Sequence, residues 1–155
     1  MSAAELDLPR RDLIWAAFAT RYAFRPSVVR FPGISEPAAS VTWDLTALES
    51  RPELDRAGRI TMIRSVPEGQ GLYVLDWQHP CFWLDPARTP PRDWPLGVYP
   101  DGDYYIHITQ DLSAGLFGHP WEKTLCAFGD AVLPHVAGLD KLMPRVRYGG
   151  QPLDA

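Results

Sequence analysis

The sequence predicts an α+β fold: a single domain in which an antiparallel sheet of about four to five strands packs against roughly two to three helices. Apolar residues recur with helical spacing near both ends of the chain. Segments that alternate in the manner of strands lie between them. A regular alternation of strand and helix is missing, and a length of 155 residues fits one domain spanning 1–155.

The amino-terminal part begins with an expected helix over residues 9–22, for which Asp7 is the N-cap. Its apolar residues are spaced about one helical turn apart: Leu13, Ile14, Ala17, Phe18 and Tyr22. Residues 40–46 alternate as a strand does. Residues 53–66 are ambiguous, because their apolar spacing favours a helix although Gly58 in a helix interior costs about 1 kcal/mol.

The middle of the chain holds the clearest strands, within residues 71–84 and 104–109. His79 and Pro80 interrupt the first of these segments. Residues 85–103 are rich in proline and glycine and show no periodicity, so we expect a long loop that ends in a turn.

The carboxyl-terminal part is expected to form a turn over residues 115–118 and a helix over residues 120–136, since Pro120 suits a first helical position. The helical spacing is carried by Trp121, Leu125, Phe128 and Val132. Residues 143–148 are a candidate strand, and residues 149–155 resemble a frayed tail.

Charge and composition exclude several classes of protein. The net charge is -4 and basic residues do not cluster, which argues against nucleic-acid binding. No run of roughly 18 apolar residues and no secretory signal is present, so we expect no membrane association and a cytoplasmic location. The two cysteines are expected to be free thiols. No glycine-rich phosphate loop supports a nucleotide cofactor, and none is expected.

Three short polar segments bring together residue types used in acid–base chemistry. They end predicted strands or open the predicted helix, where rigid elements present polar groups to a cleft. The candidates are Asp76, His79, Asp101, Asp103, His119 and Glu122. His79 or His119 would be a general base, because imidazole titrates near neutrality. The alternative is structural: Asp76 caps a turn and His79 fills a bulge.

The segment 118–122 predicts an anion site at a helix start. Main-chain N–H groups at such a start favour negative charge, so His119 would stabilise an oxyanion and Glu122 would lie in the first helical turn. The alternative is simple capping, in which Glu122 bonds to the free N–H groups and Trp121 belongs to the core.

Other chemistries have less support. A metal site built from His79, His119 and one carboxylate lacks a recognised ligand spacing, so we expect no metal. Cys126 is expected to be an inert buried thiol, and Cys81 is a nucleophile candidate without visible activation. A packed core explains the tryptophans as well as a substrate pocket does. The expected pocket residues are Trp77, Trp94, Trp121 and Asp101.

Several motifs carry a resemblance to a known family. They are Leu75-Asp-Trp-Gln-His-Pro80, Pro100-Asp-Gly-Asp-Tyr-Tyr105, and Phe117-Gly-His-Pro-Trp-Glu122 with Leu125-Cys-Ala-Phe-Gly129. Together with the amino-terminal helix and residues 40–44, they make most of the chain resemble the DUF2716 family of bacterial proteins. The resemblance implies a compact α+β domain and assigns no activity. His107 departs from the family pattern, which is more often aromatic at this position.

We therefore hypothesise a small enzyme that needs no cofactor and uses histidine and carboxylate acid–base chemistry on a small metabolite. The alternative is a non-catalytic binding module, such as an immunity or antitoxin-like protein that covers a protein partner. Convergence of His79, His119 and Asp103 on one pocket favours the enzyme. Burial in separate hydrogen-bond networks, with a large apolar patch elsewhere, favours the module. The oligomeric state stays open.

Overall fold

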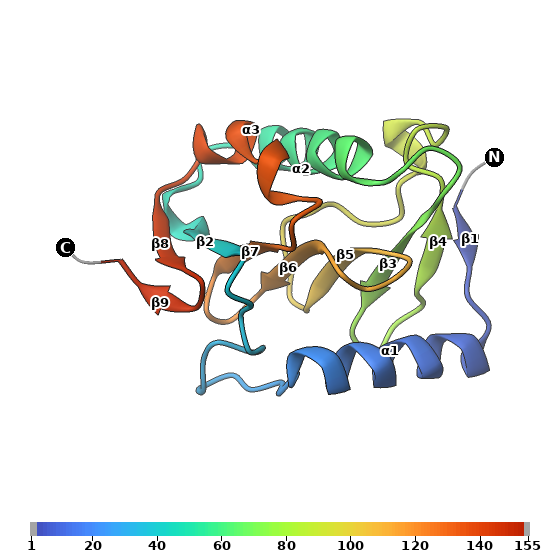
Figure 1. Ribbon diagram of the computed structural model, residues 1–155, viewed down its shortest axis with the longest axis horizontal. Coiled ribbons are helices and arrows are strands. Elements are labelled where there is room, and N and C mark those ends of the chain that lie inside the picture. The colour runs from blue at the N-terminus through green and yellow to red at the C-terminus, as the bar shows by residue number, and fades with distance from the viewer. Residues whose placement is uncertain (1–2, 154–155) are drawn as a thin grey trace.

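An antiparallel sheet of nine strands forms the middle layer of the computed structural model, which describes residues 3–153 (Figure 1). Across the sheet the strands are β1 (Ala4–Glu5), β4 (Phe82–Leu84), β3 (Leu72–Asp76), β5 (Tyr105–Thr109), β6 (Gly115–His119), β7 (Thr124–Phe128), β2 (Ser40–Asp44), β8 (Arg145–Tyr148) and β9 (Gln151–Pro152). The expected sheet of about four to five strands was therefore wrong in size, although the fold is broadly α+β. The additional strands are of two kinds. Strands β1 and β9 are two-residue strands at the edges of the sheet, and β6 and β7 are segments for which the sequence predicted a turn and a helix.

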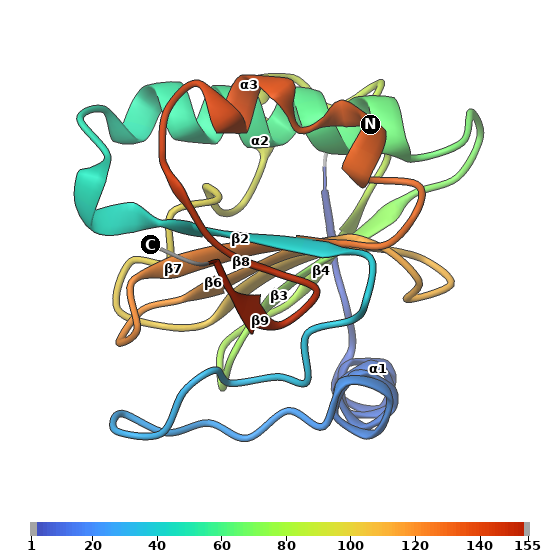
Figure 2. The same ribbon diagram turned by 60° about the vertical axis from the view of Figure 1, so that its left-hand side comes forward.

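Helices cover both faces of the sheet (Figure 2). Helix α1 (Leu8–Tyr22) lies on one face, and α2 (Arg51–Ser65) and α3 (Ala137–Asp140) lie on the other. The side chains of Asp7 and Ser50 cap α1 and α2 by accepting hydrogen bonds from backbone N–H groups. Three 3₁₀ turns complete the helical segments: Leu45–Ala47, Pro91–Asp93 and Leu133–His135. Across residues 3–153, every helix is too short or too polar to cross a membrane.

Two hydrophobic cores result, one on each face of the sheet. The core beneath α2 and α3 contains Leu54, Val74 and Leu116. The core above α1 contains Phe18, Leu75 and Phe117. Neighbouring residues of one strand therefore enter different cores, which makes the central strands apolar on both faces.

The expected helix over residues 120–136 was wrong, because residues 124–128 form the central strand β7. Each of its five residues is buried. A strand covered on both faces has a continuous apolar run, and such a run also contains residues at helical spacing. Pro120 lies in the turn between β6 and β7, which closes when Lys123 N donates to the His119 carbonyl oxygen.

Two smaller expectations were also wrong. Residues 115–118 belong to strand β6, and the turn lies just before them, where the Asp111 carboxylate accepts hydrogen bonds from Thr109 and Ser113. The expected frayed tail, 149–155, is ordered as strand β9 at Gln151–Pro152. Residues 154–155 of that tail lie outside the described residues.

Candidate functional site

Two turns meet at one end of the sheet and hold the candidate site. Asp76 is the last residue of β3 and pairs with Tyr105, the first residue of β5. The turn after β3 is held by His79 N donating to the Asp76 carbonyl oxygen, with Gln78 at a φ of 65°. Trp77 N donates to the carbonyl oxygen of Tyr104 at 3.2 Å, which fixes this turn to the segment before β5. Asp103 belongs to that segment, so both turns deliver polar side chains to one place.

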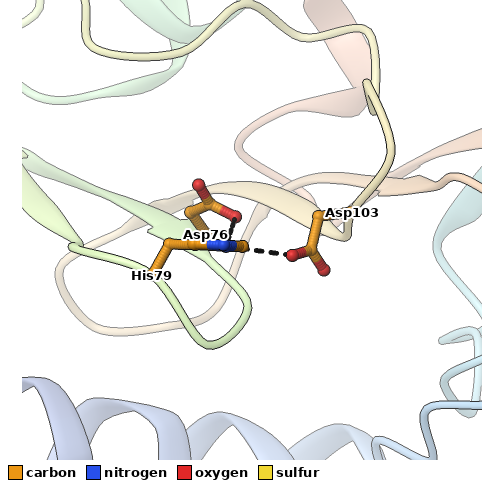
Figure 3. A group of neighbouring side chains, drawn as sticks. All are labelled: Asp76, His79 and Asp103. Carbon is orange, nitrogen blue, oxygen red and sulfur yellow. Dashed lines mark hydrogen bonds and ion pairs between the residues drawn. The ribbon is translucent and has the colours of Figure 1, made fainter.

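Asp76 and Asp103 hold the same nitrogen of His79 (Figure 3). Nδ1 of His79 lies 3.1 Å from Oδ1 of Asp76 and 3.0 Å from Oδ2 of Asp103. Asp103 is itself held, because its Oδ1 accepts the N–H of Tyr104 at 2.9 Å. We call these three residues the His79 cluster.

The His79 cluster combines an exposed ring with two shielded carboxylates. The His79 side chain is 57% exposed, whereas the side chains of Asp76 and Asp103 are each 14% exposed. No hydrogen bond to Nε2 of His79 occurs within residues 3–153. The hydrogen bond that His79 makes to the Asp76 carboxylate raises the pKa of His79 above its ordinary value of 6.5. Burial raises the pKa of Asp76, against the opposing effect of His79.

The His79 cluster is also the group of described residues whose ligand atoms could reach one metal ion, since these atoms lie within 4.8 Å of one another. The separations of 3.0 and 3.1 Å from Nδ1 are ordinary charge-assisted hydrogen-bond lengths. A proton shared by the imidazole and the two carboxylates is therefore sufficient to account for the arrangement.

His119 does not join the His79 cluster. Its ring is buried on the α1 face of the sheet, enclosed by the rings of Phe31, Tyr104 and Trp121. Nδ1 of His119 accepts the N–H groups of Trp121 and Glu122 at 3.3 and 3.1 Å, so the ring caps the β6–β7 turn. Nε2 is buried and has no hydrogen-bond partner in the described part of the chain. Burial lowers the pKa of His119 to about 4, which keeps the ring neutral.

Glu122 belongs to a separate ionic network that sequence reasoning missed. Arg147 lies between two carboxylates, with Nη1 2.7 Å from Glu122 and Nε 2.8 Å from Glu36. Thr124 donates to Glu122, and Thr42 donates to Glu36. Burial acts to raise the pKa of Glu122, but the hydrogen bonds from Arg147 and Thr124 bring it below its ordinary value. Arg147 and Glu36 are 111 residues apart, so no local pattern signals the pair.

The expected pocket residues are dispersed. Asp101 is 72% exposed and lies 3.7 Å from Arg51. Trp94 is buried in the core beneath α2, where it stacks on His107. Trp121 packs edge-to-face on Tyr104 and is partly exposed. Of the three tryptophans, Trp77 lines a cavity beside the turn that carries His79.

That cavity has a volume of about 430 Å³ and lies between α1 and the turn that carries His79. Trp15, Phe24, Trp77 and Gln78 contribute to its wall. Sequence reasoning did not single out Trp15, because the helical spacing of α1 does not show which loop packs on this residue. Tyr105 was also missed; it lies beside Asp76 in the sheet and its hydroxyl donates to the Asp101 carbonyl oxygen.

The two cysteines are buried and free. Burial raises the pKa of the Cys81 thiol, whose sulfur accepts hydrogen bonds from Trp15 Nε1 and Asp76 N. Burial likewise raises the pKa of Cys126. Both sulfurs therefore stay protonated at neutral pH, and neither is an activated nucleophile.

Comparison with known proteins gives a family but no activity. A family model described as "Protein of unknown function (DUF2716)" matches residues 5–133. The chain is similar to the "Uncharacterized protein YxiI" of Bacillus subtilis (strain 168), with 42% identity over 66 residues. This alignment spans 40% of the chain and 41% of that relative. No solved structure matches the chain.

Proposed function

Since the chain belongs to the DUF2716 family, whose function is unknown, we propose that it is a small enzyme in which His79 performs acid–base chemistry on a small metabolite. One observation carries the proposal. An exposed imidazole has Nδ1 held by Asp76 and Asp103 at 3.1 and 3.0 Å, while Nε2 has no hydrogen-bond partner among residues 3–153.

The arrangement assigns a role to each atom of the ring. Nδ1 faces two carboxylate oxygens, so it carries a proton and donates it. In the neutral ring Nε2 is then the proton acceptor, which removes a proton from the substrate. The resulting imidazolium is stabilised by Asp76 and Asp103, and it returns the proton from Nε2 to a leaving group or to water. The carboxylates are positioning residues because they act through His79.

The cavity next to the turn supports a substrate with a flat apolar part. Trp77 and Gln78 line it and directly precede His79 in the chain. Trp15 and Phe24 contribute further aromatic surface, which suits a planar ring. The substrate class that fits is a small molecule with an aromatic or heteroaromatic body and a transferable proton.

Hydrolysis of p-nitrophenyl acetate tests the reactivity of Nε2. We expect the rate of the wild-type protein to rise with pH through the raised pKa of His79, because the neutral ring is the reactive form. His79→Gln should lower the rate by at least about tenfold. Glu68→Gln, which changes an exposed carboxylate on another turn, should leave the rate unchanged. Equal rates for His79→Gln and the wild type would reject the proposal.

The role of the carboxylates is tested by NMR titration of the His79 ring. Asp76→Asn removes the largest cause of the raised pKa, so the pKa of His79 should fall towards 6.5. The ester-hydrolysis profile should move to lower pH in parallel. A profile that stays in place while the NMR titration moves would show that His79 is not the reacting group.

The alternative, a protein-binding module, has two observations in its favour. His119 is buried apart from the His79 cluster, in hydrogen bonds of its own. The segment between α1 and β2 exposes Val28, Val29 and Phe31, which are 59%, 77% and 43% exposed. An immunity or antitoxin-like protein would use such an apolar surface to cover its protein partner. In that case Val29→Asp should abolish binding of the protein partner, and His79→Gln should leave that binding unchanged.

A further inference from the structure

A groove between α2 and α3, on the face of the sheet opposite α1, has the properties of a second binding site. Its volume is about 400 Å³, a size that accepts a small organic molecule. Ala57 and Ile60 of α2 line one side, and Gly138 and Leu142 line the other. A Cβ atom added at Gly138 would lie 3.7 Å from Ala57, so glycine leaves the groove open here without being required by the packing.

The groove is positively charged in a chain whose net charge is -4. Arg56 and Arg64 line it from α2, and Lys141 lines it from the segment after α3. Each of these three cations lacks an ion pair within residues 3–153. Glu53 is the one acidic residue in the lining. A bound anion would supply the opposite charge that these cations lack.

An apolar part of the groove lies between two charged parts. Arg56 and Arg64 are eight positions apart, which is about 12 Å along a helix, and Ile60 lies midway between them. Ile60 is 37% exposed, so the floor between the cations is apolar and accessible. A ligand that fits both features joins an anionic group to an apolar body.

We propose that the groove between α2 and α3 binds a small organic anion, a carboxylate or phosphate attached to an aromatic or alkyl body. The anionic group pairs with Arg64 and Lys141, and the body covers Ala57 and Ile60. The site is independent of the His79 cluster and does not require catalysis there.

Titration of the labelled protein with 1-naphthyl phosphate, followed by NMR of the backbone amides, tests the proposal. We expect saturable shifts in α2 and α3, weakened by added salt because the contacts are ionic and exposed. Inorganic phosphate lacks the apolar body and 1-naphthol lacks the charge, so each should bind at least about tenfold more weakly.

Variants locate the site. Arg64→Ala and Lys141→Ala should each weaken 1-naphthyl phosphate by about fivefold or more, whereas Arg59→Ala removes a cation from the same helix outside the groove and should have no effect. Gly138→Val should weaken binding by narrowing the groove. His79→Gln should bind like the wild type, which separates this site from the proposed enzyme site.

Three outcomes would overturn the proposal: no saturation by 1-naphthyl phosphate or 1-naphthoate, equal affinity for inorganic phosphate, or the same loss in Arg59→Ala as in Arg64→Ala. If the groove instead serves an acidic protein, the small anions will fail to saturate it, and the proposal is rejected.

Discussion

The free energy of unfolding should depend on pH through two buried histidines, whose pKa values are shifted in the opposite direction to that of His79. His107 and His119 are both buried, and burial lowers the pKa of each to about 4. An unfolded histidine has a pKa of about 6.5, so the unfolded chain binds more protons between these two values. The contribution of the two neutral, buried histidines to the free energy of unfolding is complete above about pH 6.5 and is lost as the pH falls towards 4.

For His107 this loss should reach about 3 kcal/mol at pH 4, since one pKa unit corresponds to about 1.4 kcal/mol. Urea unfolding between pH 7 and pH 4 measures it. His107→Leu removes one of the two titrating groups and should reduce this pH dependence by about half, because His119 has a similarly lowered pKa. An unchanged pH dependence in His107→Leu would contradict the assignment.

His119 should contribute to stability rather than to catalysis. His119→Ala opens a cavity beneath Phe31 and Tyr104 and removes the acceptor of two backbone N–H groups. We expect the free energy of unfolding to fall by about 2–4 kcal/mol. His119→Asn restores an acceptor and should recover part of the loss. A His119→Ala protein with wild-type stability would contradict this role.

At the scale of residues, the sequence located part of the site. Asp76 and Asp103 flank the ends of two strands that pair, so their approach follows from a turn signal and a strand signal. Glu122 and His119 were tied to a helix that does not exist, because their surroundings depend on Arg147, Glu36 and Phe31 from distant segments. Such contacts leave no local pattern.

Among the helices, α2 owes its position to a glycine. A Cβ atom added at Gly58 would lie 2.3 Å from a methyl carbon of Val98, far inside contact distance. Helix propensity alone favours Gly58→Ala by about 1 kcal/mol. The overlap outweighs this gain, so we expect Gly58→Ala to lower the melting temperature. Adding Val98→Ala should recover stability relative to Gly58→Ala, and a Gly58→Ala single variant that is more stable than the wild type would contradict the packing argument.

Elements with one polar face were predictable, and elements with none were not. Helices α1 and α2 expose one side to solvent, so their apolar residues recur at helical spacing, although Gly58 left the segment of α2 ambiguous. Strands β6 and β7 lie between two cores and are buried at every residue, so their sequence carries no alternation. The two-residue strands β1 and β9 are too short for any pattern to appear.

The whole protein should contain no stoichiometric metal after purification. The His79 cluster can share a proton among its three side chains, and this proton occupies the position that an ion would need. Elemental analysis should therefore find zinc, iron and manganese well below one ion per chain. About one ion per chain, lost in Asp103→Asn, would contradict this expectation.

Strand β2 precedes most of the sheet in sequence but lies between β7 and β8 within it. During synthesis on the ribosome, β3, β5, β6 and β7 emerge in the order in which they pair and can assemble as they appear. The earlier β2 has no neighbour until β7 has left the exit tunnel, and β8, which pairs with β2 and β9, cannot join the rest of the sheet until β2 has docked. Closing such a long loop is slow. The apolar face of α1 would stay exposed until the strands that cover it have formed. The nascent chain would therefore pass through a stage in which chaperones can bind this exposed helix.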